Sequence, residues 1–150
     1  MYRLSLAFLL VLPLGYPYQN PVPARAVITL QRGPCERRCA VYKVAIFGDG
    51  TVIFDGQYYV RKPGPAKARI SSDQVGALIA EFRAIDYFDL KDQTCNQADA
   101  DAPTVITSIA LGGQGKSVLH DLGCQGPVAA KLKALEDKID KVANTARWVR

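Results

Sequence analysis

Four cysteines and a single histidine are the residues of this 150-residue sequence with the most specific chemistry. An even number of cysteines favours disulfide bonds in an exported chain, and four cysteines allow three pairings. We favour Cys35 with Cys39 and Cys95 with Cys124, because a bridge needs α-carbons within about 7 Å and a short spacing meets that limit wherever the chain turns. The first pair therefore predicts a turn over residues 36–38.

A zinc site is the alternative for the same side chains. Cys35, Cys39, His120 and Cys124 together offer three thiolates and one imidazole, a donor set that suits zinc. An oxidising compartment disfavours free thiolates, so we expect disulfide bonds, no metal and no cofactor. Neither cysteine pair has the Cys-x-x-Cys spacing of a thioredoxin-like protein, which argues against a redox role.

His120 is the only histidine, and Asp121 follows it. A Ser-His-Asp arrangement needs a positioned serine, but the sequence has no Gly-x-Ser-x-Gly turn, and Ser71 and Ser72 fit better as helix caps. No two carboxylates stand in an apolar setting that would separate their pKa values. We therefore expect a structural or surface histidine and no catalytic residue. The alternative is a small hydrolase-like enzyme that uses His120 and nearby carboxylates.

Acidic residues around the third cysteine offer hard oxygen ligands of the kind that calcium prefers. They are Asp89, Asp92, Asp99 and Asp101. The EF-hand spacing, with its central glycine and terminal glutamate, is missing, and a turn at residues 101–103 explains the last two aspartates more simply. We therefore expect no calcium here.

Arginines gather around the first cysteine pair. Arg32, Arg37 and Arg38 lie near a turn and could bind a carboxylate or a phosphate, although a solvated loop is the simpler interpretation. We take Arg37 and Arg38, together with Asp99 and Asp101 of the later loop, as a possible binding loop.

The first residues resemble an export signal. Arg3 precedes an apolar run over residues 4–14, and the small-x-small pattern Ala24-Arg25-Ala26 follows. A membrane-spanning helix needs about 20 apolar residues, so this shorter run favours a cleaved signal over residues 1–26, with a retained anchor as the alternative. Cleavage would leave a single domain over residues 27–150, located in the periplasm or secreted.

The charge balance is modest. The whole chain carries a net charge of +5, and removal of residues 1–26 would leave +3. No long basic stripe with interleaved aromatic residues is present, so we expect no nucleic-acid partner. We also expect no membrane association after signal cleavage, and a monomer.

Hydrophobic periodicity predicts the elements that must position these side chains. Alternating residues predict strands over 27–31, 41–47, 51–54, 57–61 and 67–70, then over 104–111 and 116–121. Apolar residues at helical spacing predict one helix that begins at the capping box of Ser71 and Gln74, and a second that is entered through Gly126-Pro127. We also expect Trp148 to anchor the C-terminal region on the sheet or on the first helix. Hairpin connections imply an α+β fold, an antiparallel meander with two amphipathic helices on one face.

Several short motifs occur in an order that resembles the bacterial family called domain of unknown function 6438. They span about residues 28–149 and read Leu30-Gln31-Arg32-Gly33-Pro34-Cys35, Cys39-Ala40-Val41-Tyr42, Gly48-Asp49-Gly50-Thr51-Val52, Asp101-Ala102-Pro103-Thr104, Val118-Leu119-His120-Asp121-Leu122-Gly123-Cys124, Leu135-Glu136 and Arg147-Trp148-Val149. The resemblance implies an exported bacterial protein and brings no established activity. The chain departs from a Cys-x-Gly-x-Cys-Pro loop, since residues 36–38 are Glu-Arg-Arg and residue 40 is alanine.

These observations together favour a small exported, non-enzymatic binding domain. We expect it to bind a protein or a cell-envelope component through its sheet edge or through the loops at residues 35–39 and 95–103. The enzyme based on His120 and a structural domain without a ligand are the alternatives.

Overall fold

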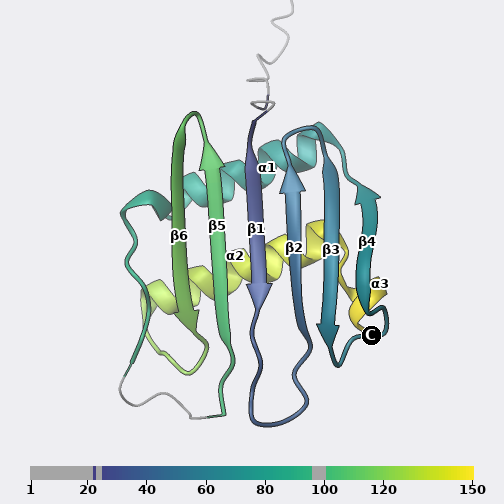
Figure 1. Ribbon diagram of the computed structural model, residues 1–150. Coiled ribbons are helices and arrows are strands. Elements are labelled where there is room, and N and C mark those ends of the chain that lie inside the picture. The colour runs from purple at the N-terminus through teal and green to yellow at the C-terminus, as the bar shows by residue number, and fades with distance from the viewer. Residues whose placement is uncertain (1–21, 23–24, 96–100) are drawn as a thin grey trace, which may run out of the picture.

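Alternating apolar side chains build one antiparallel sheet in the computed structural model, which describes residues 22, 25–95 and 101–150 (Figure 1). Its six strands lie in the order β4-β3-β2-β1-β5-β6. Their bounds are Val27–Arg32 for β1, Val41–Phe47 for β2, Thr51–Tyr58 for β3, Gly64–Arg69 for β4, Thr104–Leu111 for β5 and Gln114–Asp121 for β6. Every neighbouring pair is antiparallel.

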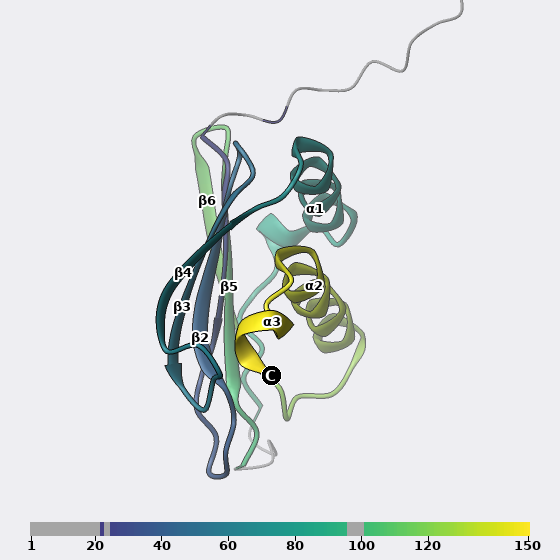
Figure 2. The ribbon, with the colours of Figure 1, turned by 90° about the vertical axis from the view of Figure 1, so that its right-hand side faces the viewer.

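The helices cover one face of this sheet (Figure 2). Helix α1, Ser72–Ala84, begins at the expected capping box, in which the Gln74 amide donates to Ser71 Oγ at 3.2 Å. A short 3-10 helix η1, Tyr87–Asp89, follows, and α2, Pro127–Ala143, and α3, Ala146–Val149, come after β6. The α+β fold with two helices on one face of the sheet is therefore confirmed.

The segment between β3 and β4 differs from the prediction. The prediction of a separate strand over residues 57–61 is wrong, because β3 continues to Tyr58 and residues 59–63 form the turn. Gly56 lies where the chain returns, and a Cβ there would come within 2.3 Å of the Lys62 carbonyl oxygen. The turn can pack against β3 at this point only because residue 56 has no side chain.

Trp148 of α3 fixes the C-terminal region on the sheet. Its ring stacks on Phe54 of β3 with centroids 4.8 Å apart, and Lys62 N donates to the Trp148 carbonyl oxygen at 2.9 Å. The expected aromatic anchor is thus present, and it joins α3 to the turn between β3 and β4.

Candidate functional site

Three loops and α3 meet at one end of the sheet, which we call the loop end. It comprises residues 33–40 between β1 and β2, residues 59–63 between β3 and β4, residues 101–103 before β5, and α3 (Figure 1). The opposite end carries the tight turns from β2 to β3 and from β5 to β6. The first of the two loops that we expected to bind a partner, residues 35–39, and the described end of the second, residues 101–103, therefore lie at the same end of the sheet.

A cavity of about 750 Å³ opens at the loop end between the sheet and the C-terminal helices. That volume lies in the range of about 300–1,000 Å³ that ligand sites occupy. The sheet side is lined by Arg32, Gly33, Cys39, Ala40, Tyr42, Pro103 and Val105, and the helical side by Asp137, Asp140, Lys141, Asn144, Thr145, Ala146, Val149 and Arg150.

A disulfide bond and a close backbone contact shape the sheet side of this cavity. Cys35 and Cys39 are paired with α-carbons 5.7 Å apart, which closes the predicted turn. Gly33 N donates to the Thr104 carbonyl oxygen at 2.8 Å, and a Cβ on Gly33 would come within 2.9 Å of Thr104 Oγ1. Glycine at this position thus brings the loop that follows β1 against the start of β5.

A polar network centred on Asp140 forms the wall between sheet and helix. Arg32 Nε donates to Asp140 Oδ2 at 2.8 Å, and Arg32 Nη2 lies 2.7 Å from the same oxygen. Tyr42 and Thr145 donate their hydroxyls to Asp140 Oδ1 at 2.8 and 2.7 Å. Both carboxylate oxygens are therefore occupied, which fixes α2 on β1 and β2.

The network raises the pKa values of Arg32 and Tyr42. Burial is the largest single influence on Arg32 and acts to lower its pKa, but the charges and hydrogen bonds of Asp140 and Tyr42 together raise it above its ordinary value. Burial, and then the negative charge of Asp140, raise the pKa of Tyr42. At neutral pH, Arg32 therefore stays charged and Tyr42 stays protonated, so both can donate hydrogen bonds in the wall of the cavity.

The structure describes three of the four residues that we expected in a binding loop. Arg37 and Arg38 are exposed in the loop that Cys35 and Cys39 close, beside the cavity. Asp101 is half-buried at the same end, whereas Asp99 lies outside the described residues.

The calcium interpretation gains no support from the described aspartates. Asp92 Oδ1 accepts the Leu119 amide at 2.8 Å, so this carboxylate caps a backbone group. In the described ranges, the one group of three close metal-ligating side chains is Cys95, Asp121 and Cys124, and two of these are joined in a disulfide bond.

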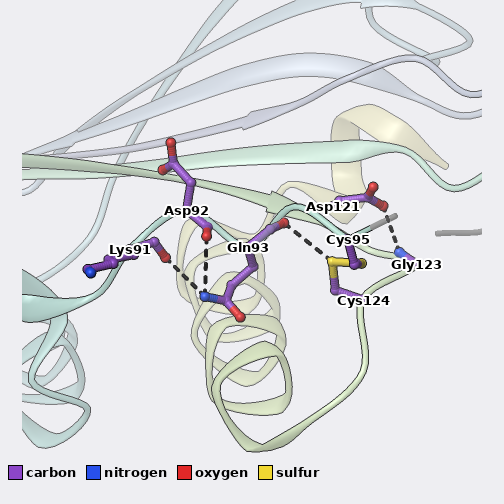
Figure 3. The surroundings of a disulfide bond; sticks show 7 residues. All are labelled: Lys91, Asp92, Gln93, Cys95, Asp121, Gly123 and Cys124. Atoms are coloured by element: carbon purple, nitrogen blue, oxygen red, sulfur yellow. Dashed lines mark hydrogen bonds between the residues drawn. A yellow bond between two sulfur atoms is a disulfide. The ribbon is translucent and has the colours of Figure 1, made fainter. Parts of the chain in front are cut away.

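The second disulfide bond ties a segment to the outer edge of the sheet (Figure 3). Cys95 and Cys124 have α-carbons 5.7 Å apart, and Cys124 Sγ lies 3.4 Å from the Gln93 carbonyl oxygen. Gln93 in turn pairs with β6, since its amide donates to Leu119 O at 2.8 Å and its carbonyl accepts from the Asp121 amide at 2.9 Å. Both cysteine pairs are the ones we favoured, and the alternative zinc set is not assembled.

His120 lies in a second polar site, within the core. Its Nδ1 is 2.8 Å from Glu136 Oε1, and the two residues are 1% and 0% exposed. Burial raises the pKa of Glu136, while the hydrogen bond and charge of His120 oppose that rise. Three buried polar atoms of the described chain have no hydrogen-bond partner here: Thr107 Oγ1, His120 Nε2 and Glu136 Oε2.

Glu136 was not predicted from the sequence as the partner of His120. Its position on α2 could have indicated that it is buried, because residues 132, 136, 139 and 143 recur at helical spacing and all are buried. A carboxylate on an otherwise apolar stripe needs a partner in the core, and the single histidine is the available one.

This core pair does not line the cavity. His120 has an acid within hydrogen-bond distance, as the hydrolase alternative requires, but it has no access to a ligand. The structure therefore places His120 in the core, away from the cavity.

A family model described as a domain of unknown function (DUF6438) matches residues 26–143, which is most of the chain. The chain belongs to the DUF6438 family. Among curated proteins, no match was found. The match includes Ala26, which is 1% exposed and accepts the Gly48 amide through its carbonyl at 2.7 Å, so the DUF6438 domain includes the residue before β1. No helix in the described ranges is long and apolar enough to cross a membrane.

Proposed function

We propose that this DUF6438 protein is an exported, non-enzymatic binding domain that acts as a monomer and recognises its partner at the loop end. The observation that carries the proposal is the cavity of about 750 Å³ that the disulfide-closed loop, the start of β5 and α3 line together. A rigid concave surface with a few placed polar groups is the usual form of a binding site. The Asp140 network supplies such groups without a free base or nucleophile.

Export is the second part of the proposal. Two disulfide bonds are compatible with an oxidising compartment such as the periplasm. Most of residues 1–26, the proposed signal, lies outside the described residues. Intact-mass and N-terminal analysis of the protein from its native host tests this part. A product that begins at Met1 with four free thiols would contradict it.

Site-specific photo-crosslinking in the native host tests the binding site. Ala146, exposed at the cavity, and Gln114, exposed at the opposite end of the sheet, are each replaced by a photoreactive phenylalanine analogue. We expect a reproducible covalent adduct from position 146 and none from position 114. Equal labelling from both positions, or labelling from neither, would count against a specific site at the loop end.

A cavity-filling substitution gives the matching measurement with the purified crosslinked partner. Ala40→Trp places an indole in the cavity, while Ala110→Trp makes the same change at an exposed position on β5. We expect the Kd to rise at least tenfold for Ala40→Trp and to stay within twofold for Ala110→Trp, with both variants folded by circular dichroism. An unchanged Kd for the folded Ala40→Trp protein would remove the cavity from the binding site.

A further inference from the structure

Two adjacent tyrosines stand out of the surface at the loop end. Tyr58 and Tyr59 are 66% and 62% exposed, and the remaining large exposed apolar residue of the described chain is Phe47 near the opposite end. Tyrosine is enriched at protein interfaces because it offers a large apolar area and one hydroxyl at a small entropic cost.

Tyr59 is also held in a strained conformation. Its φ is 53°, in the left-handed region, which is a genuine outlier for a bulky side chain. Among the residues that the structure describes, the other two non-glycine residues with positive φ are Asp86 and Asn144, types that tolerate this region well. Strain of this kind concentrates at functional sites, and here it projects an aromatic ring into solvent.

Five exposed cations lie in the chain segments that carry these tyrosines or line the cavity, and we call them the basic patch. They are Arg61, Lys62, Lys141, Arg147 and Arg150. Arg37 and Arg38 of the disulfide-closed loop lie at the same end of the sheet (Figure 1).

Neutral groups hold two members of the basic patch, Arg61 and Arg147. Arg61 donates to the Arg147 carbonyl, and Arg147 donates to the Ala143 carbonyl and lies 4.3 Å over the Trp148 ring. No ion pair found in the described ranges joins a patch residue to a carboxylate.

The two acids that line the cavity are already engaged. Asp140 pairs with Arg32, and Asp137 pairs with Lys133 at 2.7 Å and with Arg32 at 3.4 Å. Within the part of the chain that the structure describes, the positive charge of the basic patch is therefore left for a ligand.

We propose that the loop end binds an acidic segment of a partner protein, with its carboxylates on the basic patch and an aromatic or aliphatic side chain against Tyr58 and Tyr59. This inference rests on the proposed function and adds the chemistry of the partner. A concave site with exposed tyrosine and arginine suits a polypeptide, whose side chains can enter the cavity. Insertion into a bilayer would need a larger apolar surface than this end offers. Among the described residues, Tyr58 and Tyr59 are the large apolar side chains exposed there.

A labelled peptide tests the proposal directly. The probe is a fluorescent twelve-residue peptide of glutamate with two phenylalanines, and its partner is the full, oxidised protein in fluorescence anisotropy. The control peptide replaces every glutamate by glutamine. We expect saturable binding of the acidic peptide, weakening as salt rises from low to physiological concentration, and at least tenfold weaker binding of the control peptide.

Matched charge reversals locate the site. Lys62→Glu with Lys141→Glu changes the basic patch, whereas Lys67→Glu with Lys116→Glu makes the same net change on β4 and β6. We expect the first pair to raise the Kd of the acidic peptide at least tenfold and the second pair to raise it less than threefold. Equal effects of the two pairs would overturn the proposal, because they would reflect overall charge.

Tyr59→Asn separates a binding role from a structural one. Asparagine tolerates the left-handed region, so we expect an unchanged or higher melting temperature together with at least fivefold weaker binding of the acidic peptide. A lower melting temperature with unchanged binding would make Tyr59 a structural residue and contradict its part in the site.

Two further results would overturn the proposal without removing the proposed function. One is binding of phosphatidylglycerol vesicles, lost in the Lys62→Glu, Lys141→Glu protein, with no binding of the acidic peptide. The other is a crosslinked partner from position 146 whose labelled segment carries no excess of acidic residues.

Discussion

Helix α2 presents two acids to the sheet one turn apart, and the structure uses them in opposite ways. Asp140 is open to the cavity and has both oxygens bonded to Arg32, Tyr42 and Thr145. Glu136 is fully buried, bonds to His120 through one oxygen and leaves the other without a partner. The partnered network shapes a surface, whereas the buried pair is sealed from any ligand.

Each site also has its own disulfide bond. Cys39 of the short bridge lines the cavity beside the Asp140 network. The long bridge, from Cys95 to Cys124, holds the segment in which Gln93 pairs with His120 along the edge of β6. The single histidine, which stands out in the sequence, therefore belongs to the buried site of His120 and Glu136, which we call the closed site. The ligand-accessible site around Asp140, which we call the open site, is built from residue types that are common on protein surfaces.

The largest expected effect comes from separating the buried pair. His120→Leu leaves the Glu136 carboxyl without its partner in the core. We expect a loss on the order of 3 kcal/mol of unfolding free energy, because a buried polar group without a partner keeps its full desolvation cost. Chemical denaturation measures the loss. The double variant His120→Leu, Glu136→Leu replaces the pair with apolar volume, and we expect it to recover most of that loss. A single variant as stable as the wild type would show that the pair is not a structural element of the core.

The two disulfide bonds give the next contrast. In the chain-entropy model the 29-residue separation of Cys95 and Cys124 is worth about 3.6 kcal/mol, and the separation of 4 between Cys35 and Cys39 about 2 kcal/mol. We therefore expect Cys95→Ser with Cys124→Ser to lower the unfolding free energy more than Cys35→Ser with Cys39→Ser. The short pair should affect partner binding instead, because it shapes the cavity. The reverse ranking of stabilities would contradict this division between the two sites.

Substitution in the open site should lower the unfolding free energy less than substitution in the core pair. Asp140→Ala removes the acceptor of Arg32, Tyr42 and Thr145, and we expect a loss of about 2 kcal/mol, since hydrogen bonds to a charged group contribute about 1.5–3 kcal/mol. Asp137→Ala, on the same helix but with a side chain 54% exposed, is the control and should change the unfolding free energy by about 0.5 kcal/mol or less. Equal losses for the two variants would remove the distinction between the network and an ordinary surface ion pair.

The sequence predicts the fold of this protein much better than its sites, for physical reasons. Strands and helices follow local periodicity, and the caps at Ser71 and Pro127 are local too, so their positions are confirmed. The end of β3 and the start of β4 are not, since β4 begins at Gly64 and not at Lys67. They depend on the close approach of Gly56 to the Lys62 carbonyl oxygen after the chain has turned.

Both sites depend on contacts between residues far apart in the sequence. Arg32 finds Asp140 across 108 positions, and no local pattern of either residue indicates the other. His120 and Glu136 are closer in sequence, but whether that histidine is catalytic or structural depends on the sheet and α2 that bury it.

The smallest expected effect is a change in how stability depends on pH. Burial raises the pKa of Glu136 above its ordinary value of 4.5, so the folded protein keeps the proton more strongly than the unfolded chain. Its contribution to stability is therefore complete below about pH 4.5 and is lost as the pH rises through the raised pKa, with a slope of at most about 1.4 kcal/mol per pH unit for one proton. Glu136→Gln has no such proton, so its stability should fall less between pH 5 and 7 than that of the wild type in denaturation curves at matched ionic strength. Asp137→Gln is the control and should follow the wild-type curve. Parallel curves for the wild type and Glu136→Gln would mean that His120 keeps Glu136 ionised, and the closed site would then be a buried ion pair as fixed in charge as the open one.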